Sequence, residues 1–225
     1  MKYSPMLFKP FLVHGIDIGI KRKTRRIVDP QPVVTACQQP NTPQVQDMAK
    51  AAIQMILDGQ CPYGGVGDRI WVREPGWERP PRTSKMLREG ADTWERFVYD
   101  ANGLPDVAGN AWSDDETKAW FKHHGWKRRP SIHMPRWACR FELEIERVEA
   151  QPLLDISDWD AVLEGIEPCT HEGEWRDYLS PTVEVRRGFK TPRKSFFSLW
   201  DFINGKGSAA KNPWVWAIDF KVVRL

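Results

Sequence analysis

The strongest constraint on the fold is an alternation of apolar and polar side chains close to the C-terminus. Every second residue from Trp214 to Val222 is apolar, whereas Asp219 and Lys221 lie between them. A two-residue period predicts a β-strand with one buried face, which places Trp214 and Trp216 in the core. The segment 141–146 alternates apolar residues with glutamates and predicts a second strand, whose glutamate face is exposed.

Other segments carry helix or strand signals. Residues 42–59 predict a helix with Thr42 as N-cap and Pro43 at the first helical position. We expect its apolar face to be core: Val45, Met48, Ala52, Met55 and Ile56. Further elements are a strand over 69–74, a short helix within 155–165 capped by Ser157, and a helix over 194–204.

The order of these elements indicates the fold class. Separated strands with few helices and no β-α-β rhythm favour an open or closed β-barrel over a doubly wound sheet. We therefore expect an α+β fold, mainly β, with a small barrel and flanking short helices. A length of 225 residues fits a single domain. Turn signals such as Asn102-Gly103 interrupt residues 75–130, which we interpret as an inserted or decorated region within that domain.

Several classes of protein are disfavoured. No apolar stretch approaches the ~20 residues of a membrane span, and the N-terminus lacks the features of a secretory signal, so we expect a cytoplasmic protein. The four cysteines are widely spaced, and the pair His123-His124 is best interpreted as solvated. Dinucleotide and P-loop motifs are absent from the sequence. We expect no metal ion and no cofactor.

The net charge of +3 conceals strong segregation along the chain. Residues 1–50 carry an excess of five positive charges and residues 121–140 an excess of six, whereas residues 141–180 carry an excess of ten negative charges. The basic blocks at 21–26 and 127–129 could form a phosphate-binding surface or a solvated face complementary to the acidic segment. Charge alone does not decide between these two interpretations.

Several motifs, taken in order, resemble the ASCH domain of the PUA-like superfamily, and in particular a subgroup common in phage and prophage genomes. They are Gly19–Arg26, Gly67–Glu74, Ser131–Trp137, Asp155–Gly165, Leu199–Asn204 and Asn212–Trp216. The resemblance covers nearly the whole chain and is weakest over residues 77–125. It implies a small β-barrel whose cleft accommodates a nucleobase or a nucleic-acid segment, and a bacterial host cell if the gene belongs to a phage.

One branch of this family hydrolyses the acetyl amide of N4-acetylcytidine with a lysine, a threonine three residues later and a glutamate on a helix. Residue by residue, this resemblance implies catalytic roles for Lys21, Thr24 and Glu164. The commoner family pattern has threonine at the second position, where this chain has Arg22, and Lys23 is a competitor for the role of Lys21. The implied partner is a modified nucleoside, RNA or DNA.

The residues themselves are compatible with this chemistry. Amide hydrolysis needs an activated nucleophile and a stabilised oxyanion, and Thr24 supplies a hydroxyl. Lys21 can act as a base only if burial or nearby cations lower its pKa from ~10.4, and Glu164 can orient it or exchange a proton. The same residues could instead bind phosphate without catalysing a reaction. A non-catalytic RNA- or DNA-binding module is therefore an alternative.

Further residues are candidates for substrate or nucleic-acid binding: Lys23, Arg25, Arg26, Glu74, His133, Arg136 and Trp137. Arg136 and Trp137 offer a cation and a flat ring for a stacked base. Glu74 could pair with Arg73 or with the basic loop. A ribonuclease that uses His133 and Glu164 as acid and base is a further alternative.

Overall fold

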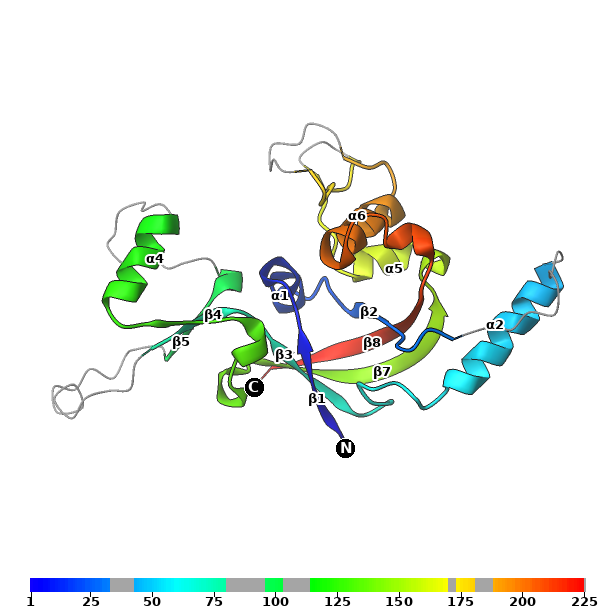
Figure 1. The fold of residues 1–225 in the computed structure, drawn as a ribbon, viewed down its shortest axis with the longest axis horizontal. Helices are drawn as coiled ribbons and strands as arrows, with labels where there is room; N and C mark the ends of the chain where they lie inside the picture. Colours follow the sequence, from blue (N-terminus) through cyan, green and yellow to red (C-terminus); the bar gives the residue numbers. More distant parts are fainter. Residues whose placement is uncertain (33–42, 80–95, 103–113, 170–172, 181–187, 225) are drawn as a thin grey trace.

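The computed structural model describes residues 1–32, 43–79, 96–102, 114–169, 173–180 and 188–224. These residues form an α+β fold with a mixed five-stranded sheet and a separate three-stranded sheet (Figure 1). The large sheet has the strand order β1-β3-β7-β8-β2. Its strands are β1 (Tyr3–Leu7), β3 (Arg69–Arg73), β7 (Phe141–Pro152), β8 (Trp214–Arg224) and β2 (Lys23–Ile27).

The large sheet is mixed because β1 pairs with β3 in parallel, whereas the other neighbouring strands pair antiparallel. Strands β1 and β2 form its two edges, and no pairing within the described residues joins them into a closed barrel. The predicted α+β class is therefore confirmed in its coarser form. Strands β7 and β8 form the longest ladder, which is interrupted by a register shift between Ile145 and Arg147.

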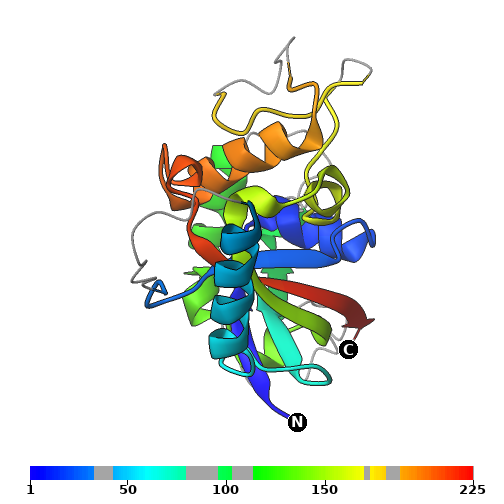
Figure 2. The same ribbon diagram turned by 90° about the vertical axis from the view of Figure 1, so that its right-hand side faces the viewer.

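Three helices lie on one face of this sheet, as Figures 1 and 2 show. They are α1 (Pro10–Asp17), α5 (Asp158–Leu163) and α6 (Pro192–Asn204). Proline at the first turn of α1 and of α6 fits the start of a helix, where its missing N–H has no intrahelical partner. Ser157 caps α5 by accepting a hydrogen bond from the Asp160 N–H at 3.0 Å, as the sequence predicted.

The main hydrophobic core lies between these helices and the large sheet. Its buried residues include Leu12 and Ile16 of α1, Leu199 of α6, and Ile218 and Phe220 of β8. On the predicted face of β8, Trp216, Ile218 and Phe220 are buried, whereas Trp214 and Val222 are half-buried. The prediction of a single buried face is wrong for the first half of β8, because Val215 and Ala217 on the opposite face are buried too. On β7, the predicted residues Phe141, Leu143 and Ile145 are buried. The predicted exposure of all three glutamates on β7 is wrong, since Glu142 is buried and pairs with Arg69 at 2.9 Å.

Helix α2 (Pro43–Leu57) forms where the sequence predicted it, but a different face packs on the protein. Ile53 is 7% exposed and Leu57 is also buried, whereas Met48, Met55 and Ile56 are exposed. The predicted core face is therefore wrong, because α2 contacts β7 through its Ile53 side. Thr42 and the Val45 side chain lie outside the described residues.

The segment 75–130 builds its own small sheet, seen on the left of Figure 1. Its antiparallel strands are β5 (Phe97–Tyr99), β4 (Gly76–Glu78) and β6 (Lys127–Arg129), in that order, and α4 (Asp114–His123) packs on them. Trp77, Val98 and Phe121 form a separate hydrophobic cluster there. This segment thus has its own sheet and its own core, while β3 runs directly into β4.

Short 3₁₀ helices connect the larger elements. They are η1 (Asp100–Asn102), η2 (Ser131–His133), η3 (Arg136–Ala138), η4 (Leu153–Asp155) and η5 (Ala209–Lys211). Among the described helices, none combines the length and the hydropathy required to cross a bilayer. The described part of the chain also holds no cluster of three or more histidine, cysteine or acidic side chains suited to a metal ion.

Candidate functional site

Lys21 lies in the tight connection between α1 and β2, and main-chain bonds fix its position. Its own N–H donates to the Gly15 carbonyl at 2.9 Å, and the Arg22 N–H donates to the Leu163 carbonyl at 2.9 Å. The connection is thereby bonded to the last turn of α1 on one side and to the end of α5 on the other. As a result, a residue from the start of the chain meets the segment around Glu164.

Two glycines make room for the Lys21 stem. Gly165 has φ +83°, and a Cβ added to it would lie 3.0 Å from the Lys21 Cβ. A Cβ added to Gly15 would lie 3.5 Å from the same atom. Gly165 therefore has two structural roles: it adopts a left-handed backbone conformation, and it leaves room for the Lys21 side chain that a larger residue would obstruct.

The Lys21 side chain is 1% exposed, and its ammonium has three acceptors around it. Nζ donates to the Glu164 Oε2 at 3.0 Å, to the Glu164 carbonyl at 2.6 Å and to the Lys23 carbonyl at 2.7 Å. Burial lowers the pKa of Lys21, Glu164 opposes this shift, and nearby Arg26 and Arg25 lower the pKa further. Lys21 is therefore easier to deprotonate than an exposed lysine, although the protein satisfies its charged form.

Glu164 accepts hydrogen bonds from two buried cations. Its Oε2 meets Lys21, and its Oε1 accepts from Arg25 Nη1 at 2.9 Å. Burial alone would raise the pKa of Glu164, but Lys21 and Arg25 outweigh this effect, and the pKa lies below its ordinary value. Glu164 is thus ionised at neutral pH.

A second ring of charges surrounds this pair. Arg25 Nη2 lies 3.2 Å from Asp160 Oδ2. Lys23 Nζ lies 2.8 Å from Asp160 Oδ1 and 3.0 Å from Asp219 Oδ1. Lys23 therefore belongs to an outer ion pair and does not replace Lys21 beside Glu164.

A small pocket opens beside the charged cluster, between β2, α1 and α6. Its polar lining comprises Lys21, Thr24, Arg25, Arg26 and Glu164. Its apolar lining includes Leu12, Phe196, Leu199 and Trp200. The cavity volume is about 60 Å³, which is room for about two water molecules at ~30 Å³ each. The pocket suits a small group that is polar on one side and apolar on the other.

Two N–H donors on the pocket-lining residues have no acceptor within the described part of the chain. Arg26 donates through Nη2 to the Leu7 carbonyl at 2.7 Å, and no described carboxylate forms an ion pair with it. The Nε of Arg26 and the Nε1 of Trp200 are buried, and neither has a hydrogen-bond partner within the described residues. Such buried donors are uncommon, and an acceptor oxygen from a bound molecule would satisfy them.

The structure brings together Lys21, Thr24, Arg25, Arg26 and Glu164, with Lys23 just outside, and places four other predicted residues elsewhere. Glu74 is buried, and Arg140 donates to it through Nε at 2.8 Å and Nη2 at 2.9 Å. This bidentate pair gives Glu74 a partner that the sequence did not indicate. His133 is exposed on η2 and does not line the pocket with Glu164.

Arg136 and Trp137 lie on η3, near the small sheet and apart from the pocket lining. Sequence reasoning missed Asp160 and Trp200 as members of the candidate site. The sequence marks Asp160 only as part of a helix cap, and Trp200 only as one apolar residue of α6.

With this geometry described, the chain can be compared with known proteins. It matches no protein-family model, no curated protein sequence and no solved structure. The case for function therefore rests on the pocket and its charged residues.

Proposed function

We propose that this protein is an amidohydrolase that removes an acyl group from an N4-acylated cytidine-type base, on a PUA-like fold of the ASCH type. One observation carries the proposal: Lys21, Thr24 and Glu164 line one pocket, with Lys21 Nζ 3.0 Å from Glu164 Oε2. Lys21 and Glu164 lie 143 positions apart in sequence. The fold assignment is supported by the motif resemblance and by the ion pair between Lys21 and Glu164, the residue that directly follows α5.

In this mechanism, the Thr24 hydroxyl attacks the acyl carbonyl carbon. The Thr24 proton passes to Lys21, the bond between the carbonyl carbon and N4 breaks, and Lys21 gives that proton to N4, which leaves as an amine. Water then hydrolyses the Thr24 ester, which releases the carboxylate and regenerates the hydroxyl. Thr24 is buried and lines the pocket, and no hydrogen bond of its side chain is observed within the described residues.

Lys21 must first lose a proton, because the ammonium uses all three of its N–H groups as donors. Glu164 Oε2 is the nearest carboxylate that can take this proton. Burial favours the neutral pair, whereas Arg25 on the other oxygen of Glu164 favours the ionised pair. Arg25 thus keeps the resting site charged, and the lysine becomes a base only through transfer to Glu164.

The remaining groups fit the acyl end of the substrate. Within the described residues, the Nε of Arg26 has no hydrogen-bond partner, and this cation can stabilise the oxyanion because a donor already held in place needs no reorganisation during the reaction. Leu199 and Phe196 offer apolar contact to an acyl methyl. A cavity of about 60 Å³ holds the acyl group but not a whole nucleoside, so the base and sugar would extend from its open side.

The test is acetate release from N4-acetylcytidine by the wild-type chain and two variants of Thr24. Thr24→Val keeps the shape but removes the hydroxyl and should abolish turnover, whereas Thr24→Ser should retain part of it. Circular dichroism checks that both variants fold. Equal turnover by the wild type and Thr24→Val would refute the proposal, as would binding of N4-acetylcytidine without acetate release.

A further inference from the structure

A group of arginine and tryptophan side chains lies on β3, on η3 and at the residue that precedes β5, away from the pocket. We call it the Arg–Trp surface, and its members are Trp71, Arg73, Arg96, Arg136 and Trp137. Trp71 packs against a small cluster that contains Phe97, and Phe97 lies 6.2 Å from Trp137 between ring centroids. These contacts connect the five residues into one continuous feature.

The aromatic rings of this surface are interleaved with guanidinium groups. The Arg96 Cζ lies 3.8 Å from the Trp137 ring centroid. The Arg73 Cζ and the Arg136 Cζ lie 5.0 Å and 5.4 Å from the Trp71 ring centroid. Trp137 nevertheless remains 45% exposed, so a ring already in contact with a cation still faces solvent.

The charge of this region is strongly positive. Its segments, 69–79, 96–102 and 126–142, carry nine lysine and arginine residues and four carboxylates. Each carboxylate already pairs with another arginine of the region: Glu74 with Arg140, Glu78 with Arg129, Asp100 with Arg128, and Glu142 with Arg69 and Arg136. Within the described residues, Arg73 and Arg96 have no carboxylate partner, although Arg73 Nη2 donates to the carbonyls of Ile132 and Met134. The positive charge of both residues therefore has no counter-charge within the described residues and can attract an outside anion.

We propose that the Arg–Trp surface binds single-stranded nucleic acid, with a base stacked on Trp137 and backbone phosphates on Arg73 and Arg96. Aromatic rings alternating with unpaired cations suit a strand in which bases and phosphates alternate. Bases in a single strand are free to stack on a protein ring, whereas bases inside a duplex are stacked on one another. This surface is separate from the pocket, so the proposal stands whether or not the pocket hydrolyses an amide.

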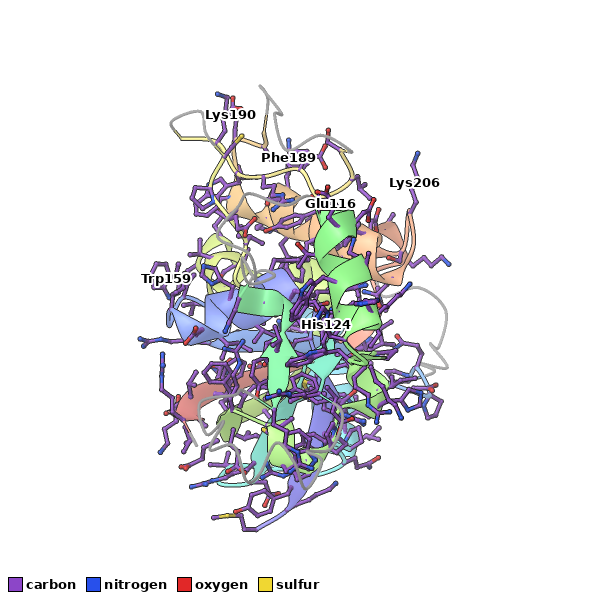
Figure 3. All side chains as sticks on the ribbon, turned by 90° about the vertical axis from the view of Figure 1, so that its left-hand side faces the viewer. Glu116, His124, Trp159, Phe189, Lys190 and Lys206 are labelled. Atoms are coloured by element: carbon purple, nitrogen blue, oxygen red, sulfur yellow. The ribbon has the colours of Figure 1, made fainter. Side chains whose placement is uncertain are left out.

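The experiment measures the affinity of the full chain for a fluorescein-labelled 12-nucleotide uridine strand by fluorescence anisotropy. Trp137→Ala should weaken binding roughly 5- to 150-fold, as expected when one base no longer stacks on the protein. The matched control is Trp159→Ala, which removes a tryptophan that is 68% exposed on α5. Figure 3 shows Trp159 projecting from the molecule at a distance from Glu116 and His124 of α4. Trp159→Ala should bind as the wild type does.

A second variant separates charge from stacking. Arg73→Gln with Arg96→Gln should reduce the slope of log affinity against log salt by about 0.7 for each phosphate that the variant no longer neutralises. Equal affinity of the wild type and Trp137→Ala would overturn the proposal, as would equal losses in Trp137→Ala and Trp159→Ala. Equal affinity for a duplex of the same length, or for an acidic peptide, would also overturn it, because either result would mean simple attraction of polyanions.

Discussion

The charged cluster at Glu164 makes a specific prediction about stability. The change Glu164→Gln keeps the size of the side chain but removes the charge that faces Lys21 and Arg25. The amide oxygen can accept from one of these cations, and the amide NH₂ group then faces the N–H groups of the other. The variant therefore leaves a buried cation without its counter-charge.

The expected magnitude follows from the burial of all three partners. Glu164 is 4% exposed, and Lys21 and Arg25 are also buried. Removing one partner of a buried pair costs about 3–5 kcal/mol of the free energy of unfolding. For a chain of this size, that loss lowers Tm by roughly 6–20 °C. The free energy of unfolding of a folded domain is typically ~5–15 kcal/mol, so Glu164→Gln should still fold, with a lower stability that unfolding experiments can measure.

The assay is urea unfolding followed by tryptophan fluorescence, for the wild type, Glu164→Gln, Lys21→Met and the double variant. Lys21→Met removes the cation while its unbranched stem still fits beside Gly15 and Gly165. Because each single change leaves a charge unpaired, the double variant should be more stable than the sum of the single losses predicts, by about 0.5–3 kcal/mol. Additive losses would refute the argument that Lys21 and Glu164 stabilise each other.

The pH dependence gives an independent check. The pKa of Glu164 is lower in the folded chain than in the unfolded chain, so its contribution to stability is complete above the unfolded value of about 4.3. This contribution is lost as pH falls through the folded value. The difference in stability between the wild type and Glu164→Gln should therefore narrow below about pH 4. A difference that stays constant from pH 7 to pH 3 would contradict this account.

Three further outcomes follow from packing and backbone geometry, each measured by chemical unfolding. Ile53→Ala should lower the free energy of unfolding by about 2–5 kcal/mol, because Ile53 is buried. Met55→Ala should change it by less than about 0.5 kcal/mol, because Met55 is 80% exposed. A larger loss in Met55→Ala than in Ile53→Ala would mean that the other face of α2 is the packed one. Ser157→Ala should cost about 1 kcal/mol through loss of the α5 cap, and an unchanged midpoint would argue against that cap. Gly165→Ala should destabilise the fold by about 1 kcal/mol or more and displace Lys21. Alanine would have to adopt φ +83°, and its Cβ would lie 3.0 Å from the Lys21 Cβ. An unchanged free energy of unfolding would show that the backbone relaxes there.

Local patterns predicted most of the secondary structure. The period of two in β8 and β7, the proline at the first position of α2 and the serine cap of α5 act over a few residues, and all appear in the structure. The buried face of α2 could not be predicted in the same way. Apolar residues lie on more than one side of that helix, and only contact with β7 decides which of them are buried.

The candidate site shows the same division. The resemblance selected Lys21, Thr24 and Glu164 as one group, and the structure brings them to one pocket. Sequence analysis also proposed Glu74, His133 and Trp137 as binding residues, and these lie outside that pocket lining. Glu74 instead pairs with Arg140, a partner 66 positions away that no local pattern could identify.

The sequence by itself determined the strands and helices with strong periodicity and the charge segregation, whereas the candidate nucleophile and base were nominated by the family resemblance. Tertiary structure alone decided which charges meet and which remain unpaired. Glu164, Asp160 and Asp219 neutralise Lys21, Lys23 and Arg25, while Arg26, Arg73 and Arg96 have no carboxylate partner within the described residues. The reason is physical: periodicity reports burial along one element, whereas ion pairing depends on distances of a few ångströms between elements far apart in the chain.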